Sequence, residues 1–337
     1  MTSLSTPNTI GGRNAFIELL QSEGVTHLFG NPATTELPLM HALADYPDMR
    51  YVLGLQEAIV VAMADGYARA SGELVACNVH VAPGLGNAMG SLFTAFNSGT
   101  PLLITAGQQE QGHGLTESLL YAPLVPIATP IVKWATEVTR LEDLPRIVHR
   151  AAKIATTPPT GPVFISLPGD ILNAFGVIDL GQATRVGTRV RPSEDGLRGL
   201  AERLLRAQRP IDPEWLMLTI IDQLPQDAII VDDALTTGAS LPAFMHLRDR
   251  YAYFGNVSGG IGWAIAAAVG IQLAQPERKI VALLGDGSAM YSIQALWTAA
   301  HQKLPVVFVV FNNGGYRIIK QRLKLSTAPS ALSGWIS

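Results

Sequence analysis

The sequence predicts an α/β protein made of two parallel-sheet domains joined by a linker. Short continuous apolar segments alternate with helical segments in two separate stretches of the chain. Uninterrupted apolar strands are typical of parallel sheets that helices cover on both faces. Between the two stretches the apolar periodicity weakens and polar residues and prolines accumulate. We therefore expect a first domain over residues 1–180, a linker over 181–212 and a second domain over 213–337.

Composition narrows the classes of function. Of the 337 residues, 48% are hydrophobic and 15% are charged, and the net charge is −3. This balance supports well-buried sheets and gives no basic surface for nucleic acid or an anionic membrane. The one cysteine, Cys77, lies in an apolar run, which predicts a small buried hydrophobe rather than a nucleophile. A single cysteine, the absence of a signal-peptide pattern and an apolar helix over Trp263–Ala274 too short to span a bilayer favour a cytoplasmic protein without a membrane segment.

The first domain is predicted from a regular alternation of elements. Gly24 and the pair Ser71-Gly72 stop helices, because glycine readily adopts the backbone conformation that ends a helix. The expected helices cover Arg13–Glu23, Glu36–Ala44, Gln56–Ala70 and Gly84–Asn97. The expected strands cover Thr26–Phe29, Tyr51–Gly54, Leu74–Val79, Leu102–Ala106 and Val163–Leu167.

The second domain repeats the same plan after a connector that holds one basic amphipathic helix over Leu197–Ala207. Its expected strands are Ala228–Val231, Ile280–Leu284 and Val306–Phe311. Its expected helices are Glu214–Gln223, Ile261–Leu273 and Ile293–Gln302. No strand is expected in the Ser/Ala/Pro-rich end of the chain.

The most informative segment runs from Gly285 to Tyr316. One apolar strand ends at Gly-Asp-Gly, and the next ends at Asn-Asn-Gly-Gly. Both ends open on one edge of a parallel sheet, so Asp286 and Asn313 can offer oxygen atoms to one magnesium ion. The 24 residues between the two motifs resemble the spacing of the thiamine diphosphate signature. That resemblance implies Asp286, Asn313 and the backbone carbonyl of Gly315 as ligands of Mg²⁺, with Gly287 and Ser288 beside the diphosphate.

A carboxylate for the other end of this cofactor is found in the first domain. Thiamine diphosphate needs a carboxylate beside N1′ of its pyrimidine ring to activate it. Glu57 follows an apolar strand and opens a helix, and apolar surroundings raise the proton affinity of a carboxylate. On its own, the residue is better explained as a first-turn Glu that favours the helix dipole.

A competing interpretation concerns Gly84-Leu85-Gly86-Asn87-Ala88-Met89-Gly90. This glycine-rich segment follows a strand and opens a helix, as a dinucleotide-binding fingerprint does, but it has one residue too many before the last glycine. No acidic residue is well placed for a ribose. An NAD(P)-binding oxidoreductase is therefore kept as a distant alternative.

Longer segments of both domains resemble benzoylformate decarboxylase and its relatives among the thiamine-diphosphate-dependent enzymes. They are FGNPATTELPLMHAL, LQEAIVVAMADGYARASG, NVHVAPGLGNAMGSLFTAFNSGTPLLITAGQQ, TGPVFISLPGD and SGGIGWAIAAAVGIQLAQPERKIVALLGDGSAMYSIQALWTAA. The resemblance implies a thiamine-diphosphate-binding fold for each domain, with pyrimidine-binding and diphosphate-binding halves. It places Glu57 as the pyrimidine-activating residue, His80 as the active-site histidine and Thr34 as a substrate contact. The cofactor-lining positions that it implies are Gly86, Asn87, Thr236, Thr237 and Ile261.

The resemblance also implies a function. A relative of these enzymes is expected to remove CO₂ from a 2-oxo acid and release an aldehyde, as a homo-oligomer whose sites are shared between subunits. An acetolactate-synthase-like carboligase and an inactive cofactor-binding remnant are the alternatives.

The chain departs from this family in two places. The family's central domain is missing at about Pro210-Ile211, and the carboxy-terminal part is missing or replaced after about Leu325. The decarboxylases draw a second acid/base histidine from a segment absent here, and no residue of this chain matches it. These departures bear on activity more than on ancestry.

Overall fold

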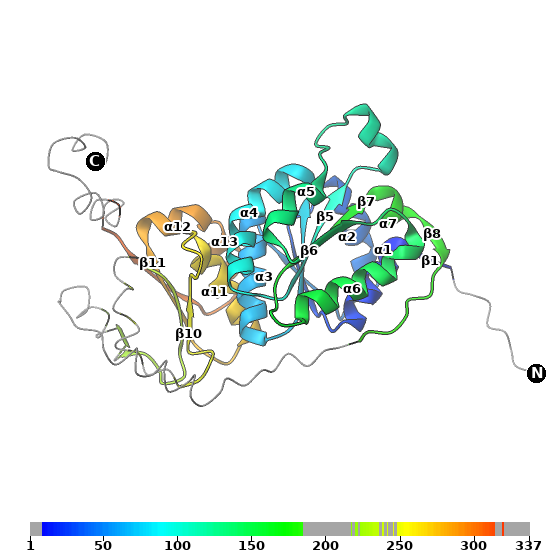
Figure 1. The fold of residues 1–337 in the computed structure, drawn as a ribbon. Helices are drawn as coiled ribbons and strands as arrows, with labels where there is room; N and C mark the ends of the chain where they lie inside the picture. The colour runs from blue at the N-terminus through cyan, green and yellow to red at the C-terminus, as the bar shows by residue number, and fades with distance from the viewer. Residues whose placement is uncertain are drawn as a thin grey trace, which may run out of the picture. The chain divides into compact units, whose positions relative to one another are not determined.

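The structure, a computed structural model, describes residues 9–184, 217, 220–221, 223–235, 238, 241, 245, 248–313 and 319. The chain divides into two compact units, Met1–Thr188 and Arg189–Ser337, which are treated separately below (Figure 1). The predicted linker at 181–212 lies outside the described residues except for its first four positions. The predicted helix at 197–207 also lies outside them, and so does most of the predicted helix at 214–223.

Unit 1 is built on a six-stranded parallel sheet with the order β3-β2-β4-β5-β7-β6. The strands are β2 (His27–Gly30), β3 (Arg50–Leu53), β4 (Val75–His80), β5 (Leu102–Gln108), β6 (Trp134–Glu137) and β7 (Val163–Pro168). All six residues of β4 except the last are buried, as are all of β5 and β7. This confirms the expectation of continuous apolar strands in a sheet covered on both faces.

Helices cover both faces of this sheet (Figure 1). One layer holds α1 (Gly12–Ser22), α2 (Leu37–Leu43), α6 (Leu144–Thr156) and α7 (Gly169–Asn173), and the other holds α3 (Glu57–Ser71), α4 (Val81–Asn97) and α5 (Leu124–Ala128). Short 3-10 segments occur at η1 (Thr34–Glu36), η2 (Gln111–Thr116), η3 (Thr129–Ile131) and η4 (Leu141–Asp143). The buried thiol of Cys77 lies in β4, where burial raises its pKa, so the expectation of a buried hydrophobe is confirmed.

A separate two-stranded antiparallel sheet joins β1 (Thr9–Gly11) to β8 (Phe175–Val177). The sequence did not predict this pair, because three-residue strands carry too little alternation to be recognised. The pairing brings the two chain ends of unit 1 together and places Gly12 against the backbone oxygen of Ile171, where a side chain would overlap it.

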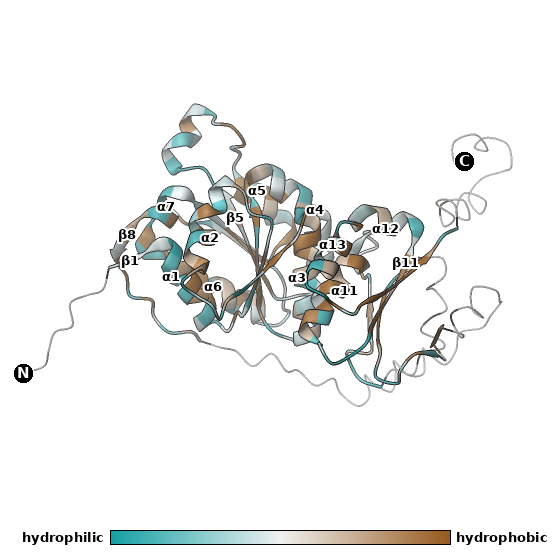
Figure 2. Cartoon of the chain, turned by 180° about the vertical axis from the view of Figure 1, so that it is seen from behind, coloured by the Kyte–Doolittle hydropathy of each residue, from teal (hydrophilic) through white to brown (hydrophobic). Residues whose placement is uncertain are grey.

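Unit 2 contains a four-stranded parallel sheet with the order β10-β9-β11-β12. Its strands are β9 (Ile229–Asp233), β10 (Tyr253–Gly255), β11 (Ile280–Gly285) and β12 (Val307–Phe311), and its helices are α11 (Trp263–Ala274), α12 (Asp286–Ser292) and α13 (Ala295–His301). Figure 2 shows β11 in the hydrophobic colour. Strand β12 lies at the sheet edge, and Val307 and Val310 are partly exposed there.

The predicted elements that lie in the described residues match the structure to within a few residues, but other elements were not predicted. In unit 1 the sequence missed β6, α5, α6 and α7. Helix α4 begins at Val81 rather than Gly84, and strand β9 extends to Asp233 rather than ending at Val231. The sequence missed the short strand β10 and also missed α12, which precedes α13 after Asp286. Within the described residues, no helix combines the length and hydropathy needed to cross a bilayer.

Candidate active site

Glu57 occupies the first position of α3, which begins after a short turn that follows β3. The side chain of Gln56 caps this helix by accepting hydrogen bonds from the backbone N–H groups of Ala58 at 2.8 Å and Ile59 at 3.3 Å. This cap satisfies donors that the helix leaves free at its start. The carboxylate of Glu57 is thereby held at a helix start with only 9% of the residue exposed.

Two asparagine amides hold this carboxylate. Asn87 of α4 donates to Oε2 of Glu57 at 3.0 Å, and Asn31, from the turn after β2, donates to Oε1 at 3.3 Å. No ion pair to Glu57 occurs among the described residues. Gly84 allows α4 to approach, since a Cβ there would lie 3.3 Å from Cγ and Oε1 of Glu57.

The surface beside Glu57 is open on the side of α4. Gly86 and Asn87 are exposed, and a Cβ added at Gly86 would meet no atom within 4 Å. Thr34 is exposed in η1. The structure therefore brings Glu57 and Asn87 into direct contact and leaves open space at Gly86.

His80 ends β4, and its imidazole points to a carboxylate that the sequence analysis did not single out. Nδ1 of His80 lies 2.8 Å from Oε2 of Glu36, which is completely buried. Val81, the next residue, is fully buried with a φ of +40°. A β-branched residue in this region is strained, and such strain is concentrated at functional sites.

In unit 2, the candidate metal ligands lie at the carboxyl edge of the parallel sheet. Gly285 pairs in register with Phe311, so Asp286 and Asn313 follow neighbouring strands at the same edge. Asp286 begins α12 and is half-buried, and Asn313 is exposed. Three predicted site residues, Thr236, Thr237 and Gly315, lie outside the described residues.

The turn that carries Ile261 is fastened to the same sheet edge by Asp233, another residue that the sequence analysis missed. Oδ2 of Asp233 accepts from the backbone N–H of Gly262 at 2.8 Å, and Oδ1 accepts from the amide of Asn256 at 3.1 Å. The Ser288 hydroxyl donates to the backbone oxygen of Asp233 at 3.3 Å. The turn before α11 is thus tied to the start of α12.

Burial dominates the electrostatics of this edge. Asp233 is 2% exposed, and desolvation raises its pKa although the hydrogen bonds from Asn256 and Gly262 oppose the rise. The neighbouring Asp232 has its pKa raised by burial as well. Among the described residues no group of three or more His, Cys, Asp or Glu side chains could hold a metal ion, and the predicted set of one carboxylate, one amide and one carbonyl is of a different kind.

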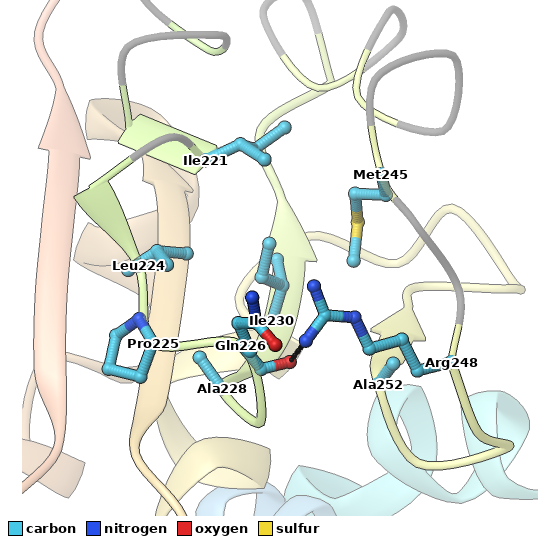
Figure 3. Close-up of a pocket in the computed structure, with 9 residues that line it drawn as sticks. All are labelled: Ile221, Leu224, Pro225, Gln226, Ala228, Ile230, Met245, Arg248 and Ala252. Carbon is cyan, nitrogen blue, oxygen red and sulfur yellow. Dashed lines mark hydrogen bonds between the residues drawn. The ribbon is translucent and has the colours of Figure 1, made fainter.

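A cavity of about 250 Å³ lies in unit 2 away from these residues (Figure 3). Its walls combine apolar side chains with the polar groups of Gln226 and Arg248, and Nη1 of Arg248 donates to the backbone oxygen of Gln226 at 2.7 Å. It is lined by Ile221, Leu224, Pro225, Gln226, Ala228, Ile230, Met245, Arg248 and Ala252. Because Ala228 and Ile230 are at the amino end of β9, this cavity lies at the opposite end of the strand from Asp233.

Fold and site define a parallel α/β protein with two units, each presenting candidate ligand residues where strands end. The chain belongs to the thiamine pyrophosphate enzyme family. Residues 10–119 match the N-terminal TPP binding domain of these enzymes, and residues 237–333 match the C-terminal TPP binding domain.

Curated relatives agree with this assignment. A benzoylformate decarboxylase of Pseudomonas aeruginosa is 28% identical over 472 aligned residues, covering 94% of this chain and 89% of the relative. A putative acetolactate synthase large subunit of Mycobacterium tuberculosis is 25% identical, covering 94% and 86%. Each alignment is longer than the 337 residues of this chain, so the relatives carry segments that it lacks.

Solved structures agree as well. A thiamine diphosphate-dependent 4-hydroxybenzoylformate decarboxylase of Rhodococcus jostii matches with a TM-score of 0.83 and 26% identity, covering 96% of this chain and 90% of that one. A benzoylformate decarboxylase of Polynucleobacter necessarius matches with a TM-score of 0.83 and 25% identity, covering 95% and 89%. The predicted family and fold are confirmed.

Proposed function

We propose that the protein is a thiamine diphosphate- and Mg²⁺-dependent decarboxylase of a 2-oxo acid, which releases CO₂ and an aldehyde. The observation that carries the proposal is the carboxylate of Glu57, nearly buried at a helix start and held by two amides beside the open surface at Gly86. The similarity to enzymes named for benzoylformate and 4-hydroxybenzoylformate decarboxylation supports this reaction class.

The residues of unit 1 fit the pyrimidine end of the cofactor. The amide groups of Asn31 and Asn87 hold the Glu57 side chain in place without neutralising its charge. A carboxylate in such a setting can share a proton with a ring nitrogen. When bound, thiamine diphosphate would supply the carbanion chemistry that decarboxylation of a 2-oxo acid requires.

The other side chains of unit 1 have distinct proposed roles. Glu57 holds a proton at N1′ of the pyrimidine ring, Asn87 and Gly86 line the ring, and His80 transfers a proton at the reacting carbon of the substrate. Thr34, exposed in the 3-10 segment before the buried Glu36, contacts the substrate carboxylate. Together these groups orient the substrate and control protons.

Unit 2 is proposed to hold the diphosphate and the metal. Asp286, Asn313 and the carbonyl of Gly315 would bind Mg²⁺, which prefers oxygen ligands shared with phosphates. Gly287, Ser288, Thr236 and Thr237 would line the diphosphate. Ile261, held in the turn that Asp233 fastens, would support the bent shape of the cofactor.

The proposal extends to domain organisation and assembly. We propose that residues 181–212 replace the central domain of the relatives and link a pyrimidine-binding domain (1–180) to a diphosphate-binding domain (213–337). The alignments that exceed the chain's own length support such a replacement. A homo-oligomer would then complete each site with residues from two subunits.

A second candidate function is an acetolactate-synthase-like carboligation, favoured by the relative from Mycobacterium tuberculosis. Product analysis with benzoylformate and with pyruvate separates the two reactions. Decarboxylation gives an aldehyde and CO₂, whereas carboligation joins the decarboxylated fragment to a second carbonyl compound. A chain that binds the cofactor and turns over neither acid would be an inactive remnant.

The decisive experiment is a calorimetric titration of thiamine diphosphate into the full chain with magnesium and then with EDTA. We expect saturable binding that requires magnesium and is lost in Asp286→Ala. Asp227→Ala, an exposed residue just before the opposite end of β9, is the matched control and should bind as the wild type does. Absence of binding by the folded wild-type chain would refute the proposal.

A further inference from the structure

We propose that Glu36 is a positioning residue that fixes the tautomer of His80, so that Nδ1 carries the proton and Nε2 is left to exchange protons with the substrate. This inference rests on the proposed function only for the role of His80 in the reaction. The arrangement of the two side chains is independent of any bound group.

The buried carboxylate of Glu36 is surrounded by hydrogen-bond donors. Oε1 accepts from the Thr35 hydroxyl at 2.7 Å and from the backbone N–H of Gly107 at 3.2 Å. Oε2 accepts from the backbone N–H of Ala33 at 3.1 Å and faces Nδ1 of His80 at 2.8 Å. A completely buried carboxylate is costly unless it is compensated, and here four donors converge on it.

The tautomer follows from the chemistry of the two partners. An ionised carboxylate can only accept hydrogen bonds, and the Thr35 hydroxyl, 3.0 Å from Nδ1 of His80, gives its proton to Oε1 of Glu36. Nδ1 of His80 is therefore the donor towards Glu36. In the neutral imidazole the other nitrogen, Nε2, then has a free lone pair. No hydrogen bond to Nε2 occurs within the described residues, so this nitrogen is available for a proton from a ligand.

Residues on neighbouring strands surround the carboxylate of Glu36. A Cβ at Gly107 of β5 would overlap Oε1 of Glu36, so a glycine there permits the close approach. Burial, together with the nearby charge of Glu36, raises the pKa of Tyr51 of β3. His80 ends β4. These contacts leave Glu36 little freedom to turn away from His80.

The test measures the tautomer directly by ¹⁵N NMR of the imidazole groups in the full chain without cofactor, at a pH where His80 is neutral. The His80→Gln variant assigns the signal. In the wild type we expect Nδ1 to have the shift of a protonated nitrogen and Nε2 that of an unprotonated one. A wild-type spectrum with the proton on Nε2 would overturn the inference without any variant.

Glu36→Gln supplies the second arm. The new amide offers one oxygen to four donors, so the Nδ1 proton loses its fixed acceptor and the population should shift towards the tautomer protonated at Nε2. Glu142→Gln, an exposed residue of η4, is the control and should leave the spectrum unchanged. A folded Glu36→Gln chain, checked by circular dichroism, with the wild-type tautomer would also overturn the inference.

A kinetic readout separates positioning from general support of the fold. With Glu36→Gln we expect kcat to fall about tenfold or more while the Kd of thiamine diphosphate changes less than about twofold, because general acid–base transfer contributes roughly 10²–10⁴-fold to a rate. Equal losses in cofactor binding and kcat would contradict a positioning role. A chain that never binds the cofactor would refute the proposed function, and the NMR test would still decide the tautomer.

Discussion

Asn87 of α4 donates its side-chain amide to Oε2 of Glu57 of α3 at 3.0 Å, and this contact joins two helices that pack on the same face of the sheet in unit 1. The two residues are 30 positions apart in the sequence. The glycine-rich segment that resembles a dinucleotide fingerprint is therefore the wall beside the buried carboxylate, which agrees with the membership of the thiamine pyrophosphate enzyme family.

The first prediction concerns the charge of Glu57. Glu57→Gln keeps the volume of the side chain but removes the acceptor that can hold a proton at the pyrimidine ring. We expect turnover of a 2-oxo acid to fall by about 10²-fold or more, the range of general acid–base catalysis, with cofactor binding weakened far less. Steady-state kinetics and calorimetry measure the two effects. Glu73→Gln, exposed after α3, is the control, and unchanged turnover in Glu57→Gln would exclude the proposed role.

The second prediction concerns the amide that holds Glu57. Asn87→Ala removes the 3.0 Å hydrogen bond from an exposed position, so the free energy of unfolding should fall by only about 1 kcal/mol. The Kd of thiamine diphosphate should rise more than this stability change suggests, because the carboxylate is no longer held in one orientation. Asn97→Ala on the same helix, which loses only a bond to the backbone of Phe93, should leave the Kd unchanged. Similar Kd values for the two variants would contradict the prediction that Asn87 orients Glu57 for cofactor binding.

The third prediction concerns Asp233 and the turn before α11. Asp233→Ala leaves the buried N–H of Gly262 without its partner, and an unsatisfied buried donor costs about 1–3 kcal/mol. We expect hydrogen exchange to accelerate at Gly262 and in the first turn of α11. Asp249→Ala, an exposed residue whose contacts lie elsewhere in unit 2, is the control. Unaltered protection of Gly262 in Asp233→Ala would show that the turn does not depend on Asp233.

Most strands and helices of both units could be predicted from the sequence, because continuous apolar runs and glycine helix stops are local signals, whereas β1, β6, β8 and β10 were missed. Glu36 could not. It looks like an ordinary acidic residue at a helix start, and its partners His80 and Gly107 are 44 and 71 positions away and meet it only through the order of the strands. Asp233 was missed for a related reason, since Asp-Asp after an apolar run is typical of a loop. In the structure Asp232 and Asp233 both belong to β9.

The predicted roles of His80 and Thr34 came from resemblance to the family, while those of Glu57 and Asp286 drew on local pattern as well, and all four stay proposals. A local pattern does not distinguish a first-turn Glu that favours the helix dipole from one that serves a cofactor. The structure adds what the pattern lacked, namely the partners of each side chain. The contact of Glu57 with Asn87 is the clearest case.

The last prediction concerns pH and His27 of β2. Burial, aided by the nearby charge of Arg50, lowers the pKa of His27 from 6.5 to about 4, and its ring packs 4.5 Å from that of Tyr67. The folded state therefore takes up the proton at lower pH than the unfolded state. Stability is complete above about pH 6.5 and falls as the pH drops from there to about 4.

The size of this effect follows from the shift and the exposure of the ring. A shift of this size would correspond to about 3 kcal/mol for a fully buried group, and partial exposure reduces the expectation to about 1 kcal/mol. Hydrogen exchange of the β4 amides at pH 7 and pH 5 measures it within unit 1. His27→Phe keeps the ring packing and should lose this part of the pH dependence, whereas His41→Phe, exposed on α2, should keep it. If His27→Phe retains the full difference between the two pH values, His27 is not its source.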